Sequence, residues 1–360
     1  MNNGGIAIRL VNCARLISGR LPGSLAQTNI VANMLFGAIS GSGTAAAAAI
    51  GGTMAPIELE EGYDKDYVAA VNIASAPTGQ LIPPSNTLIV YATVAGSVSV
   101  AALFMAGYIP GIAWGISLMF IAGYMAKRRG YVSTFSVTPK EALKVLWDAL
   151  PSLLLIIIVI GGILKGVFTA TEGSAIAVVY ALILSLCYRS LKIKDLPSII
   201  LSSCKTTCIV IFMIGVSSIM SWVMAYTMIP TAIANAMLSL SSNKYVILLL
   251  MNVILLVVGT FMDPTPAVLI FTPIFLPICQ SFGMDPVQFG IMIVFNLCIG
   301  TITPPVGVIL FTGCKVVGIS IEGVIKTLLP FFAAIAVVLL LVTYVPAMSM
   351  WIPSMLGLVK

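Results

Sequence analysis

Two clusters of small hydroxyl residues and glycines precede two proline pairs, and their oxygen atoms suit a hard cation such as Na⁺. The first cluster, Ser40-Gly41-Ser42-Gly43-Thr44, lies upstream of Pro83-Pro84. The second, Gly259-Thr260-Phe261-Met262-Asp263-Pro264, lies upstream of Pro304-Pro305. Each proline pair removes two backbone donors and forces the preceding residue out of helix. The sequence therefore predicts a helix break at each pair, with free backbone groups beside hydroxyl groups.

A broken helix of this kind can bind ions of both signs. Free carbonyls at one half-helix end can ligate a cation, and free N–H groups at the other can hold a carboxylate. The alternative is that the hydroxyl groups only cap the half-helices. Asp263 carries the same ambiguity, since a carboxylate within the membrane is a functional-site candidate but can also cap a helix that begins at Pro264. No metal other than Na⁺ and no cofactor is expected.

Composition requires these breaks to lie in a membrane. The 360 residues are 59% hydrophobic and 8% charged, with a mean hydropathy of +1.11, which a water-soluble domain cannot cover with polar surface. Histidine is absent, so the usual proton relay, the commonest metal ligand and a histidine-assisted nucleophile are not available. The net charge is +6, but the basic residues form no stripe interleaved with aromatic residues. This argues against a nucleic-acid-binding protein. The seven cysteines lack CxxC spacing and are predicted to be small buried residues.

An internal repeat relates the two proline pairs. A shift of 221 residues superposes about 60 residues without a gap. Each copy has an apolar arm, a polar tip, a second arm, a Gly-x-Asp turn and then a broken helix, so we expect two re-entrant hairpins whose first arms are residues 28–39 and 245–258. The matched positions are Pro56-Ile57 with Pro277-Ile278, Gly62 with Gly283, Asp64 with Asp285, Gly79 with Gly300, the proline pairs, and Ser99 with Ser320.

Charge predicts the topology. Three expected spans, roughly residues 150–165, 170–188 and 204–225, separate the two units, and an odd number of crossings inverts the second. With residues 127–129 in the cytoplasm, only Lys165, Lys244 and Lys360 of the 18 Lys and Arg residues lie outside, leaving 15 inside. The predicted fold is an all-α polytopic membrane protein, an inverted repeat with two re-entrant helical hairpins and two broken transmembrane helices.

Two further charged residues have predicted roles. Glu172 is expected to cap a helix start. Lys315 is expected to reach the cytoplasmic face, with binding of a substrate carboxylate as the alternative.

The sequence is predicted to contain four regions, the first of which has no signal-peptide core. The regions are an amphipathic surface arm (1–23), a first repeat that looks N-terminally truncated (24–127), a cytoplasmic linker with scaffold helices (128–244) and a second repeat (245–350).

The chain resembles the large membrane subunit (M subunit, large permease) of tripartite ATP-independent periplasmic (TRAP) transporters, in the C4-dicarboxylate permease subfamily. It departs from that family at Ala170, where a proline is usual, and at the N-terminus, where the first transmembrane helices of the family are missing. The similarity rests on residues 36–42, Ile82-Pro83-Pro84-Ser85, residues 104–111, residues 168–172, residues 259–264 and residues 302–307.

The resemblance implies an elevator-type secondary transporter of the bacterial inner membrane, driven by inward Na⁺ flow. Its partners would be a small four-helix Q-type subunit and a periplasmic P-type binding protein that delivers an organic acid. The expected sodium-site residues are Ser40, Gly41, Ser42, Gly43, Gly79, Pro83, Ser85, Gly259, Thr260, Met262, Asp263, Thr301, Thr303 and Gly307; the expected substrate-site residues are Ser42, Asn86, Thr87, Asp263, Thr265 and Thr303.

Two alternatives stay open. One is a stand-alone Na⁺/anion symporter of the ion transporter superfamily, which would not depend on a binding protein. The other is a truncated remnant that does not transport. An enzyme is not expected, because histidine is absent and no plausible catalytic Ser-Lys or Asp-Asp pair occurs at helical spacing.

Overall fold

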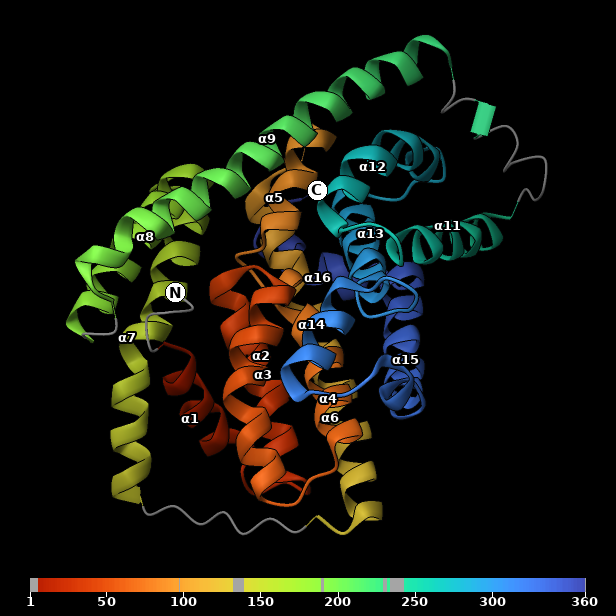
Figure 1. Cartoon of the computed structure of the whole chain (residues 1–360). Helices are drawn as coiled ribbons and strands as arrows, with labels where there is room; N and C mark the ends of the chain where they lie inside the picture. Colours follow the sequence, from red (N-terminus) through yellow and green to blue (C-terminus); the bar gives the residue numbers. More distant parts are fainter. Residues whose placement is uncertain are drawn as a thin grey trace.

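The computed structural model describes residues 6–96, 98–131, 139–188, 191–228, 232–233 and 243–359. All regular structure in these ranges is helical, as predicted, and six helices are long and apolar enough to cross a membrane. The fold is that of an all-α polytopic membrane protein (Figure 1). The six candidate spans are Val100–Arg129, Lys140–Leu164, Ala170–Cys187, Ile193–Met220, Pro264–Ser281 and Ile321–Tyr344.

The first copy of the repeat runs from α2 to α6. Helices α2 (Ser24–Ser40) and α3 (Gly43–Glu60) form a hairpin, and α4 (Lys65–Ser75), the 3-10 turn η1 (Ala76–Gln80) and α5 (Asn86–Ala95) form the broken helix. Helix α6 (Val100–Arg129) begins at Ser99, whose hydroxyl accepts a hydrogen bond from the Ala102 N–H, and it ends at Gly130 with a φ of 76°. The first predicted helix break is confirmed at Pro83-Pro84.

The second copy repeats this order. Helices α11 (Lys244–Gly259) and α12 (Pro264–Ser281) form the hairpin, and α13 (Pro286–Gly300) and α14 (Val308–Val317) are the halves of the broken helix. Helix α15 (Ile321–Tyr344) starts at Ser320, the counterpart of Ser99, and the chain ends with α16 (Ala347–Met355). The second break, at Pro304-Pro305, is therefore also present, and both Pro-Pro peptide bonds are cis.

Equivalent helices of the two copies run in opposite directions. Asp66, in the first turn of α4, accepts a hydrogen bond from Thr327 near the start of α15. Gln288, in the first turn of α13, donates to the carbonyl of Thr343 at the end of α15. Because α4 and α13 begin at opposite ends of one helix, they are antiparallel. This is the arrangement expected of an inverted repeat.

The first halves of the two broken helices lie at the centre of the fold. Every residue of α13 from Val287 to Gly300 is buried, and so is every residue of α4 from Tyr67 to Ser75. Both helices pack against α6 and α15. The breaks are thus held by buried helix rather than by loops.

Helix α1 (Ile6–Ser18) packs against α2 and α7 through the i, i+3, i+4, i+7 stripe of Ala7, Leu10, Val11 and Ala14. Ile8 and Ile17, which flank this stripe on its two sides, are exposed. The amphipathic character expected of this segment is present, and its apolar stripe faces other helices of the protein.

Helices α7 (Pro139–Leu164), α8 (Ala170–Cys187) and α9 (Leu196–Tyr226), with the short turn η2 (Ile193–Asp195) before α9, connect the two copies. Helix α9 crosses the top of the molecule in Figure 1 and buries little of its surface against other helices. This corrects the expectation for the cysteines: Cys13, Cys279, Cys298 and Cys314 are buried, but Cys187, Cys204 and Cys208 are exposed because α8 and α9 have few protein neighbours.

Candidate functional site

The first polar tip is a tight turn between α2 and α3. Gly41 takes a left-handed conformation (φ 62°), which a side chain would disfavour, and its N–H donates to the Gly37 carbonyl at 2.8 Å. The Ser42 hydroxyl accepts from the Ala45 N–H at 3.3 Å and lies 3.1 Å from the Thr44 hydroxyl. Ser42 therefore caps α3, which is the helix-capping role considered as the alternative to cation binding.

The tip and the first arm touch the first break through backbone atoms. A Cβ atom placed on Gly79 would lie 2.2 Å from the Gly37 Cα, so only glycine allows α2 and η1 to approach this closely. A Cβ on Gly41 would lie 3.0 Å from the carbonyl oxygen of Pro84 and 3.4 Å from Cγ of Asn86. The first tip and the first break thus form one continuous cluster.

Inside the first break, Ser85 joins the two half-helices. Its hydroxyl donates a hydrogen bond to the carbonyl of Gln80 and accepts one from the Leu88 N–H, which caps α5. Ser85 is fully buried. Ser85, which the sequence suggested as a cation ligand, therefore links the end of η1 to the start of α5.

The second tip is a similar turn with a carboxylate. Asp263 is the N-cap of α12 and accepts from the Thr265 N–H at 3.1 Å, and the Thr260 hydroxyl donates to the Val257 carbonyl at 2.7 Å. The Asp263 side chain is exposed and Met262 is half-buried. The capping role considered for Asp263 is present, and its second carboxylate oxygen receives no hydrogen bond from the described residues.

The second tip contacts the second break in the same way as the first. A Cβ on Gly300 would lie 2.3 Å from the Gly259 carbonyl carbon. The Gly307 N–H donates to the Thr260 carbonyl at 3.3 Å, which ties the start of α14 to the tip. The hydroxyls of Thr301 and Thr303 donate to the preceding helical turn, at 2.6 Å to the Cys298 carbonyl and 2.7 Å to the Ile299 carbonyl. Each hairpin therefore meets its own broken helix at a glycine pair.

The two copies meet at Gln80, which the sequence analysis did not select. The Cys298 thiol of α13 lies 3.1 Å from Oε1 of Gln80. A Cβ on Gly43 would lie 2.5 Å from Cδ1 of Ile309 and 3.4 Å from Cδ of Gln80. Gln80 precedes Pro83 by three residues, so its nearness in sequence to the proline pair was the available signal.

Exposure divides the predicted site residues. Asn86, at the start of α5 after the first break, and Asp263, in the second tip, are exposed. A second group is half-buried, and a third is buried. The half-buried residues are Ser40, Ser42, Thr260, Met262, Thr265 and Thr303; the buried residues are Gly41, Gly43, Gly79, Pro83, Ser85, Thr87, Gly259, Thr301 and Gly307.

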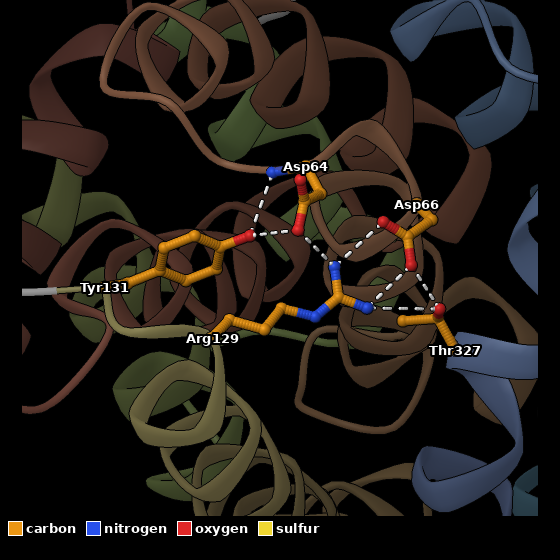
Figure 2. Close-up of polar contacts among 5 residues, drawn as sticks. All are labelled: Asp64, Asp66, Arg129, Tyr131 and Thr327. Atoms are coloured by element: carbon orange, nitrogen blue, oxygen red, sulfur yellow. Dashed lines mark hydrogen bonds and ion pairs between the residues drawn. The ribbon is translucent and has the colours of Figure 1, made fainter.

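A charged cluster fixes the turn between α3 and α4 to the rest of the protein. Figure 2 shows the Arg129 guanidinium between the carboxylates of Asp64 and Asp66, at 2.9 and 2.7 Å. Tyr131 donates to Asp64 at 2.7 Å, and Thr327 donates to Asp66. Asp66 lies outside the six candidate spans, and the hydrogen bonds from Arg129 lower its pKa to about 2. The cluster joins α4, α6 and α15 and was not anticipated from the sequence.

Two further predicted roles can be compared with the structure. Glu172 forms a complete capping box with Thr169 at the start of α8, which confirms its helix-capping role. Lys315 lies in the last turn of α14 and is exposed.

Two antiparallel copies of a hairpin facing a broken helix, set among apolar helices, define a polytopic membrane transport protein. The family model for the DctM component of the tripartite ATP-independent periplasmic transporter matches residues 1–348. The chain belongs to this family, whose homologues are inner-membrane proteins.

Curated relatives align with nearly the whole chain. It is 55% identical to the uncharacterised protein YgiK of Salmonella typhimurium, covering 99% of this chain and 82% of that protein. It is 41% identical to the isethionate TRAP transporter permease protein DctMQ of Oleidesulfovibrio alaskensis, over 98% of this chain and 55% of the relative. It is 37% identical to the C4-dicarboxylate TRAP transporter large permease protein DctM of Pseudomonas aeruginosa, over 99% and 84%.

Proposed function

We propose that the chain is the large permease of a Na⁺-coupled importer for a small organic acid that a periplasmic binding protein delivers. The observation that carries this proposal is the paired contact between tips and breaks. In each copy, the backbone of a tip that carries hydroxyl residues lies against the interrupted part of a helix, with glycine pairs 37/79 and 259/300 at the contact. Such paired broken helices are where secondary transporters bind coupling ions and substrates.

In this proposal the sodium ions bind where each tip meets its break, and the carboxylate of the substrate binds between the two tips. Asn86 at the first break and Asp263 in the second tip are exposed, so they are the groups that an incoming substrate reaches first. Half-helix N-termini at α5 and α14 supply N–H groups with a positive dipole for the carboxylate. The two hairpins are re-entrant, and they move with their broken helices relative to the scaffold.

A small four-helix membrane subunit is the proposed partner in the membrane. The exposed apolar side chains of α7 to α9, among them Trp147, Ile157 and Phe212, need lipid or another helix against them. The isethionate relative is named as a DctMQ permease, and this chain covers 55% of its length.

The proposed substrate class is a small carboxylate anion, and a small sulfonate is the alternative. The name of the Pseudomonas relative points to C4-dicarboxylates, and the name of the Oleidesulfovibrio relative points to a sulfonate. A dicarboxylate such as succinate is therefore the first probe, and isethionate is the comparison.

Uptake into proteoliposomes tests coupling. The chain, with its small membrane subunit and binding protein, should accumulate labelled substrate only when an inward Na⁺ gradient is imposed. Accumulation without Na⁺ would contradict the proposal. Accumulation that needs Na⁺ but not the binding protein would favour the stand-alone symporter, and no accumulation of any anion would favour a non-transporting remnant.

Sodium binding can be measured without knowledge of the substrate. Na⁺ should raise the melting temperature of the purified chain above its value in K⁺ at the same ionic strength, because a ligand that binds only the folded state stabilises it. Asp263→Asn should reduce this Na⁺ effect. Asp148→Asn, the same chemical change at an exposed position of α7, is the matched control and should leave it intact.

A further inference from the structure

A buried carboxyl group in the first hairpin has no role in the proposed transport site. Glu58 lies in the last turn of α3, and its side chain is fully buried. Its neighbours in sequence, Glu60 and Glu61, are exposed. Three carboxylates therefore stand within four residues, and only one of them faces the interior.

The Glu58 carboxyl group has only one side-chain partner in the described chain. Nδ2 of Asn29 lies 3.3 Å from both of its oxygens. A carboxylate has room for about four hydrogen bonds, and a single neutral amide supplies little of the stabilisation that its charge loses on leaving water. The ionised form is therefore disfavoured at this position.

Within the described residues, no cation is paired with this carboxyl group. Helix α2 and turn η1 contain no charged residue, and the phenols of Tyr63 and Tyr67 are the titratable groups close enough to interact with Glu58. The remaining charges on the helices packed against α3 are Arg9 and Arg15 of α1, Lys65 and Asp66 of α4, and Lys315 of α14. Within the described residues none of these forms an ion pair with Glu58. The ion pairs found there join Arg129 to Asp64 and Asp66.

The Asn29 amide is itself held by a buried polar chain. Its Oδ1 accepts from Nδ2 of Asn33 at 2.8 Å, so its Nδ2 is the end that faces Glu58. The Asn33 amide also donates to the Ser75 hydroxyl at 2.9 Å, and the Thr78 hydroxyl donates to the Ser75 carbonyl at 2.6 Å. All of these side chains are buried. The chain leads from Glu58 to η1, where the first helix break begins.

We propose that Glu58 is a proton-binding site, and that the folded protein holds one proton on this carboxyl group at neutral pH. Burying a neutral acid beside an amide costs much less than burying an unpaired charge. The proton enters from the turn after α3, where Glu61 and Gly62 are exposed. The polar chain through Asn29 then joins the proton site to the broken helix.

Infrared spectroscopy of the full-length purified protein tests the site directly. Wild-type protein at pH 7 should show the carbonyl stretch of a protonated carboxylic acid, and Glu58→Gln should remove it, since glutamine keeps the shape and the bond to Asn29 but has no proton to titrate. Glu60→Gln and Glu61→Gln are matched controls at exposed positions and should keep the band. Absence of the band in wild type, or its persistence in Glu58→Gln, would overturn the proposal.

The pH dependence of unfolding provides a second readout. Where the folded chain holds the Glu58 proton and the unfolded chain does not, the folded state binds one more proton, so stability falls as pH rises. The ratio of unfolded to folded wild-type protein should increase by up to about tenfold per pH unit. Glu58→Gln should lose this increase. If Glu58→Gln does not fold, the proposal is tested by two measurements on wild type and Glu60→Gln: the pH dependence of unfolding and the infrared band. Wild-type stability that does not change with pH over the range where the band is present would refute the site.

Discussion

The glycine pair between α2 and η1 gives the sharpest test of how the first hairpin meets its broken helix. In Gly79→Ala the new Cβ would lie 2.2 Å from the Cα of Gly37. Ordinary van der Waals contact begins at 3.4 Å, so the two backbones must separate by 3.4 − 2.2, or roughly 1.2 Å. The clashing atom belongs to the backbone and cannot rotate away. We therefore expect a loss of at least about 1–3 kcal/mol of unfolding free energy, the usual cost of overpacking.

Gly52 is a matched control in the same hairpin. A Cβ on Gly52 has no atom within 4 Å, and alanine is a better helix residue than glycine by about 0.5–1 kcal/mol. Gly52→Ala should therefore be as stable as wild type or more stable. Chemical unfolding of the purified variants in detergent micelles measures both changes.

The same experiment in the second copy tests whether the two contacts are equivalent. In Gly300→Ala the Cβ would lie 2.3 Å from the Gly259 carbonyl carbon, which demands a separation of 3.4 − 2.3, or roughly 1.1 Å. We expect a loss similar to that in Gly79→Ala. If either variant matched Gly52→Ala in stability, the hairpin and the broken helix would not be in backbone contact in that copy, and the proposed ion site there would lose its basis.

Three other predictions concern stability. Asp66 has a pKa of about 2 instead of its ordinary value near 3.8, so its contribution is complete above about pH 4 and is lost as pH falls toward 2; Asp66→Asn should remove that part of the acid transition in a pH series of melting curves. Thr169→Ala breaks the capping box of α8 and should cost about 0.5–2 kcal/mol, whereas Thr93→Ala, at an exposed position inside α5, should cost less. Asn252→Leu deprives buried Asn296 of its 2.7 Å side-chain partner and should cost about 1–3 kcal/mol in chemical unfolding; a loss no larger than that of Thr93→Ala would contradict this reasoning.

The sequence predicted the breaks because prolines act locally. Two successive prolines cannot continue a helix whatever surrounds them, and both breaks occur where the pairs stand, after η1 and after α13. The fixed offset of 221 residues then identified the second copy. The opposite directions of α4 and α13 were predictable from the charges at segment ends, since orientation in a membrane follows the distribution of Lys and Arg.

The contacts between segments could not be predicted in this way. The clamp of Arg129 on Asp64 and Asp66 joins residues more than 60 positions apart, and no local pattern distinguishes this arginine from Arg128 beside it. The exposure of Cys204 and Cys208 depends on which helices have neighbours. Glu58 looked like one member of an acidic run with Glu60 and Glu61, and only the packing of α3 against α2 separates it from them.

The two candidate ion sites differ although their sequences repeat. The first tip is covered by the second copy, because Gly43 lies against Ile309 of α14, and its two serines, Ser40 and Ser42, are half-buried. The second tip exposes Phe261 and Asp263. An ion at the first site would therefore be enclosed by both copies, whereas an ion at the second would be held by one copy and remain open to solvent or substrate. Because substrate between the tips would cover the second site, occupancy of that site should depend on substrate more strongly than occupancy of the first. Asp263 is thus the residue at which coupling between ion and substrate is expected.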